Sequence, residues 1–122
     1  MKTHEGKKTL INAEIWQNLI ALEKNGNPGI LKEIIGLYIS SAPHAIECLK
    51  SASKNGDFKS LCETVHSFKS SCNSVGALDL ADELDKIEAD AKKTAPTVDM
   101  QLLEATLTKI QLVTIELGSR QS

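Results

Sequence analysis

Residues 57–76 read DFKSLCETVHSFKSSCNSVG, and this stretch decides the fold. If the stretch is helical, with about 100° per residue, its apolar side chains fall within one quarter of the helix circumference. They are Leu61, Val65, Phe68, Cys72 and Val75. Asp57 can cap the start of such a helix with its carboxylate, and Gly76 can end it in a left-handed turn. The stretch therefore predicts an amphipathic helix over about 58–75 with one buried face.

The same helical spacing recurs on both sides of this stretch. Asn12 can cap a first helix, which the Asn-Gly-Asn-Pro-Gly run at 25–29 should end. Further apolar patterns cover about 30–52, then 80–91 before the Lys-Lys-Thr-Ala-Pro run, and then 103–117 before Gly118. Pro43 interrupts the second pattern, and because proline removes a donor and clashes one turn back, we expect a kink or two abutting helices there.

The chain contains no stretch of strand-like alternation and no repeat of fixed period. Five or six amphipathic helices joined by short turns favour an all-α fold, an up-and-down four-helix bundle with one or two additional short N-terminal helices. We predict a polar leader or linker over 1–9, one helical bundle domain over 10–118 and a polar tail over 119–122.

Composition restricts the class of protein. The 122 residues include 14 Lys and Arg against 16 Asp and Glu, a net charge of −2, which argues against a strongly cationic nucleic-acid surface. No run of about 18 apolar residues is present, so we expect no membrane span. The 3 cysteines include no Cys-x-x-Cys pair, which disfavours a disulfide framework or zinc module and favours a reducing cytoplasmic setting. We expect a cytoplasmic monomer.

The face opposite the apolar stripe carries His66, which we expect to point to solvent. Its angular sector also holds Lys59, Cys62, Lys69, Ser70 and Asn73, with no carboxylate nearer than Glu63. A neutral imidazole can be a nucleophile, and a lysine one turn away opposes its protonation. The same ammonium offers charge-assisted hydrogen bonds to an attached phosphoryl group. No phosphate-binding loop or magnesium-binding pair is visible, so the pattern indicates a phosphoryl acceptor without an ATP site or kinase activity of its own.

Residues 65–77, VHSFKSSCNSVGA, resemble the signature of histidine-containing phosphotransfer (HPt) domains. That signature is a His, a Lys three residues later and a Gly ten residues after the His, and His66, Lys69 and Gly76 stand at those offsets. Asn73 and residues 77–78 and 84–88 also resemble the family. One departure is Ser70, where the family often has glycine; serine is still small enough to let a partner approach.

The resemblance implies a four-helix bundle that works in two-component phosphorelays. An HPt histidine accepts a phosphoryl group from the phospho-aspartate of one receiver domain and passes it to another. His66 would then be the phospho-acceptor, Lys69 would stabilise the phosphoryl group, and Gly76 would end the helix and pack closely. The remaining face residues would meet the receiver, namely Lys59, Cys62, Ser70 and Asn73. Because the magnesium and acidic pocket belong to the receiver, we expect no cofactor and no metal in this chain.

Other hypotheses stay open at this point. The bundle could be a docking module that regulates a partner without relaying phosphate, or an unrelated helical enzyme with His66 as general base. Cys62 and His66 could form half of a metal site, but no second ligand pair accompanies them. The chain could be free-standing or a domain of a hybrid sensor kinase.

We expect a partner to dock around His66, on a surface that extends to the second helix near Ile35, Tyr38 and Ile39.

Overall fold

The computed structural model describes residues 10–121, and the predicted leader at 1–9 lies outside this range together with Ser122. Five helices occupy the described chain: α1 (Ala13–Lys24), α2 (Ile30–Asn55), α3 (Phe58–Val75), α4 (Leu78–Ala91) and α5 (Met100–Gln121). The predicted all-α class is confirmed, with a single additional helix, α1, before the four-helix bundle. Among residues 10–121, no helix is both long and apolar enough to cross a bilayer.

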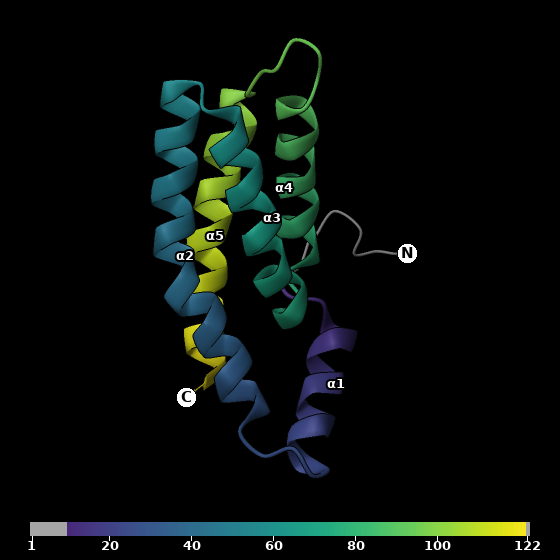
Figure 1. Ribbon diagram of the computed structural model, residues 1–122. Helices are drawn as coiled ribbons and strands as arrows, with labels where there is room; N and C mark the ends of the chain where they lie inside the picture. The colour runs from purple at the N-terminus through teal and green to yellow at the C-terminus, as the bar shows by residue number, and fades with distance from the viewer. Residues whose placement is uncertain (1–9, 122) are drawn as a thin grey trace.

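Helices α2 to α5 form an up-and-down bundle, shown in Figure 1, in which consecutive helices run in opposite directions. Helix α3 contacts α2 and α4, and α5 closes the ring by contacting the same two helices. Helix α1 lies beyond one end of α3, beside the first turns of α2 (Figure 1). A backbone hydrogen bond of 2.8 Å from Asn12 to the carbonyl of Gly76 ties its start to the end of α3.

Local sequence signals set the ends of α3. The Asp57 carboxylate accepts hydrogen bonds from the backbone N–H of Ser60 at 3.1 Å and from its hydroxyl at 2.8 Å, which caps the helix start. Gly76 ends the helix with φ +85°, a left-handed conformation that glycine adopts without the penalty of a side chain. The residues predicted to face inward, from Leu61 to Val75, are all buried.

The structure decides between the two expectations for Pro43, and one helix boundary differs from the sequence expectation. Helix α2 continues through Pro43 as one helix and changes direction along its course (Figure 1), so a bent helix replaces the alternative of two abutting helices. Helix α5 continues through Gly118 to Gln121, although we expected the helix to end at this glycine. An exposed glycine weakens a helix by only about 1 kcal/mol, which is too little to end one whose Leu117 is fully buried.

Candidate functional site

His66 is exposed on the outward face of α3, at the middle of the helix. The neighbouring inward residues Val65 and Phe68 are 0% and 3% exposed, so packing fixes the rotation of the helix that turns His66 to solvent. The expected solvent exposure of His66 is therefore met in the structure. An imidazole in this position is open to an incoming partner, while the core beneath it stays closed.

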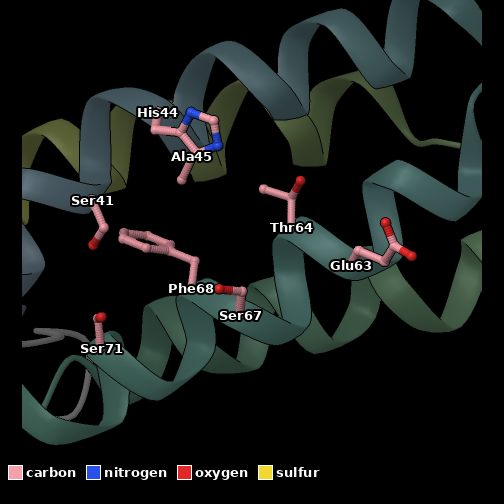
Figure 2. A pocket seen from close by; sticks show the side chains of 8 residues that line it. All are labelled: Ser41, His44, Ala45, Glu63, Thr64, Ser67, Phe68 and Ser71. Carbon is pink, nitrogen blue, oxygen red and sulfur yellow. The ribbon is translucent and has the colours of Figure 1, made fainter.

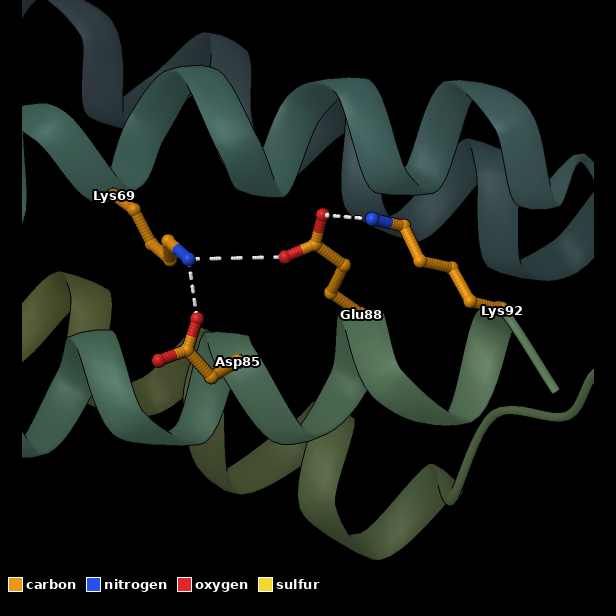
Figure 3. Close-up of polar contacts among 4 residues, drawn as sticks. All are labelled: Lys69, Asp85, Glu88 and Lys92. Atoms are coloured by element: carbon orange, nitrogen blue, oxygen red, sulfur yellow. Dashed lines mark hydrogen bonds and ion pairs between the residues drawn. The ribbon is translucent and has the colours of Figure 1, made fainter.

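Lys69, one turn after His66, is bound by carboxylates of α4. Its Nζ donates a hydrogen bond to Asp85 Oδ1 and lies 3.7 Å from Glu88 Oε1. The other oxygen of Glu88 pairs with Lys92 Nζ at 3.0 Å. Figure 3 shows these four side chains between the two helices, and we call them the Lys69 cluster. It contains two ammonium groups and two carboxylates, so its formal charge is zero.

The cluster corrects one prediction. Glu63 is the nearest carboxylate along α3, but α4 brings Asp85 and Glu88 into contact with Lys69, so the outward face is not free of carboxylates. The hydrogen bond to Asp85 is the main cause that raises the pKa of Lys69 above its ordinary value, and partial desolvation opposes the shift. Lys69 is therefore a firmly protonated ammonium at neutral pH.

The other predicted face residues differ in burial. Lys59, Ser70 and Asn73 are exposed, whereas Cys62 is half-buried toward α4. Burial is the main cause that raises the pKa of the Cys62 thiol, and the negative charge of Glu88 raises it further. Cys62 therefore stays a neutral thiol at neutral pH. Among residues 10–121, no group of three or more His, Cys, Asp or Glu side chains is arranged to hold a metal ion.

A groove between α2 and α3 runs beside the outward face (Figure 2). Ser67, the residue after His66, points into it, and Phe68 reaches across toward α2 (Figure 2). Ser41 and His44 line the opposite wall. The sequence analysis did not identify this groove, because its two walls come from helices whose relative rotation the spacing alone does not give.

The expected extension of the docking surface to Ile35 and Tyr38 is wrong. These side chains are 2% and 0% exposed, and the Tyr38 hydroxyl donates a hydrogen bond of 2.9 Å to the backbone oxygen of Ile110 in α5. Ile39 is half-buried. On this part of α2 the exposed apolar side chain is instead Leu37, at 59%.

Asp85, Glu88 and Lys92 are the candidate site residues that sequence reasoning missed. The segment 84–88 was noted only for its family resemblance, and Lys92 only as part of the Lys-Lys-Thr-Ala-Pro run that follows a predicted helix. Asp85 and Glu88 stand three residues apart, which places them on one side of α4. That spacing was a usable signal, but only the packing of α4 against α3 shows which lysine the pair meets.

Comparisons with known proteins agree with this architecture. A family model described as the Hpt domain matches residues 33–113. The fold is similar to the crystal structure of histidine-containing phosphotransfer protein B (HptB) from Pseudomonas aeruginosa PAO1, with a TM-score of 0.72 and 21% identity. That match covers 91% of this chain and 93% of the other, and at this identity it bears on the fold alone. No curated protein matches the chain.

Proposed function

The chain belongs to the Hpt domain family, whose role is histidine phosphotransfer in phosphorelays, and on that premise we propose that His66 carries the phosphoryl group. The protein accepts this group from the phospho-aspartate of one receiver domain and delivers it to the aspartate of another. Receivers are its partners, and it meets them as a monomer in the cytoplasm.

The proposed transfer is a displacement at phosphorus. The unprotonated ring nitrogen of His66 attacks the phosphorus of the aspartyl phosphate, an N–P bond forms, and the P–O bond to the aspartate breaks. The aspartate leaves as a carboxylate, and delivery to the second receiver reverses these changes. This chain contributes the nucleophile and the Lys69 ammonium, while the metal site belongs to the receiver.

The observation that carries the proposal is the exposure of His66 at the middle of α3, with Lys69 on the next turn. A receiver can place its aspartate over the ring without disturbing the core, because the residues beneath His66 pack inward. The exposed Lys59 adds positive charge on the same side for an acidic partner. The groove beside Ser67 offers polar contacts at the edge of the same surface.

Transfer of labelled phosphate from a phosphorylated receiver tests the proposal. The wild type should take up label that is labile in acid and stable in alkali, as an N–P bond is, and His66→Gln should take up none. His44→Gln is the matched control: it changes another exposed histidine, across the groove, but keeps the proposed acceptor, so it should still take up the acid-labile label.

If His66→Gln still takes up label, another residue is the acceptor and the proposed role of His66 is wrong. A wild type that takes no label from any of several competent receivers would contradict the relay role. The same bundle would then be a docking module that binds its partner without transferring phosphate.

A further inference from the structure

Lys69, the residue expected to bind a phosphoryl group on His66, already forms ion pairs with two carboxylates. Lys69 Nζ is hydrogen-bonded to Asp85 and lies 3.7 Å from Glu88, both on α4 (Figure 3). A phosphoryl group adds a charge of about −1.5 to −2 close to these carboxylates. The Lys69 cluster therefore opposes phosphorylation through its two carboxylates and favours it through its ammonium groups.

The two carboxylates are held differently. The Asp85 side chain is 54% exposed and has Lys69 as its ion-pair partner, whereas the Glu88 side chain is 13% exposed and also pairs with Lys92 at 3.0 Å. If Lys69 turns toward a phosphoryl oxygen, water can solvate the Asp85 carboxylate, and Glu88 remains paired with Lys92. Asp85 is therefore the partner that Lys69 can exchange at low cost.

We propose that Asp85 is a positioning residue that holds Lys69 against α4 and competes with phosphorylated His66 for its ammonium. This proposal rests on the proposed function of His66. Phosphorylation exchanges one charge-assisted hydrogen bond of Lys69 for another, and dephosphorylation restores the bond to Asp85. Because Lys69 must give up its hydrogen bond to Asp85 before it can bind the phosphoryl group, the competition shifts the transfer equilibrium toward donation to the next receiver.

Asp85→Asn tests the competition, with Asp82→Asn as the matched control. Both changes remove one negative charge from an exposed position on α4, and within residues 10–121 the Asp82 carboxylate has no hydrogen bond or ion pair. The measurement is the equilibrium constant for phosphoryl transfer from a phosphorylated receiver. Asp85→Asn should raise it about threefold to fivefold, the scale of an exposed ion pair, and Asp82→Asn should leave it close to the wild type.

A double-mutant cycle shows whether Asp85 acts through Lys69. In a Lys69→Ala background, Asp85→Asn should change the equilibrium constant no more than Asp82→Asn does. Asp85→Glu, which keeps the carboxylate, should restore the constant toward the wild type. Circular dichroism of each variant checks that the helical fold is kept.

The results separate this proposal from the one on which it rests. Equal constants for Asp85→Asn and Asp82→Asn would overturn the competition while leaving His66 as the acceptor. An increase that persists without Lys69 would also overturn it, because Asp85 would then act as a general negative charge. A wild type that takes no label overturns both proposals.

Discussion

The inward and outward faces of α3 are held in place by different interactions. Inward side chains such as Val65, Phe68 and Cys72 are almost completely buried, and close packing leaves each of them few alternative positions. Outward, His66 is exposed, and Lys69 is oriented by ion pairs to α4. The inward face therefore sets the stability of the helix, and the outward face sets the charge around the histidine.

This difference separates stability from chemistry within a single helix. Apolar burial contributes about 25 cal/mol per Å² and varies little with small changes in conformation. Exposed ion pairs contribute little to stability, but they decide where a charge lies. We therefore expect substitutions on the two faces to change different measured quantities, and the following predictions test that division.

Phe68→Ala should produce the largest loss of stability. The ring is 3% exposed and its centroid lies 5.2 Å from that of Tyr38, so truncation removes buried area and leaves a cavity. The free energy of unfolding should fall by about 3–5 kcal/mol, measured by urea denaturation. Ser67→Ala, at the exposed neighbouring position, should change it by no more than about 0.5 kcal/mol. Comparable losses for the two variants would show that the faces are not energetically distinct.

Gly76→Ala should have the second largest effect, at the end of α3 that lies against Ile15 of α1. The residue has φ +85°, and a Cβ there would lie 3.2 Å from Ile15 Cγ2 and 3.4 Å from the Asn12 carbonyl oxygen. The strained backbone and these contacts should together lower the free energy of unfolding by about 1–3 kcal/mol. Trp16 is the only tryptophan and is buried in α1, so its fluorescence should report a displacement of that helix.

Gly56→Ala is the matched control for this substitution. Gly56 also has a positive φ, of +65°, but a Cβ there would meet nothing within 4 Å. Gly56→Ala should therefore lower the free energy of unfolding only by the cost of the backbone strain, and it should leave the Trp16 emission unchanged. If Gly56→Ala costs as much as Gly76→Ala, close packing against α1 contributes nothing at Gly76.

The sequence predicted those features that depend on neighbours along the chain. The caps at Asn12 and Asp57, the left-handed turn at Gly76 and the buried stripe of α3 all follow from local hydrogen bonding and helical spacing. The exposure of His66 follows from that stripe, because an inward face fixes the opposite one. The position of the main candidate residue and the helix that carries it were therefore predictable from the sequence.

Features that depend on how helices pack were not predictable in the same way. Ile35 and Tyr38 lie on the apolar pattern of α2, but that pattern alone could not separate core from docking surface, and packing against α5 buries Tyr38. The partners of Lys69 lie 16 and 19 residues further along the chain, on another helix. Their contact depends on the rotation of α4 about its axis, which no spacing within α3 contains.

The smallest expected change in stability comes from the ion pair between Lys69 and Asp85 on the outward face. The pKa of Lys69 reports directly on that pair. Asp85 raises the pKa of Lys69 in the folded protein, so the stabilisation from this pair is fully present below the unfolded-state pKa and is lost as pH rises through the folded-state value. Both values lie in the alkaline range, so the pair is intact at neutral pH. Asp85→Asn should lower the pKa of Lys69 toward its ordinary value, whereas Asp82→Asn should change it little, as followed by NMR of the lysine side chain. An unchanged pKa in Asp85→Asn would mean that Lys69 is not paired with Asp85 in solution, and the outward face would then present a free ammonium beside His66.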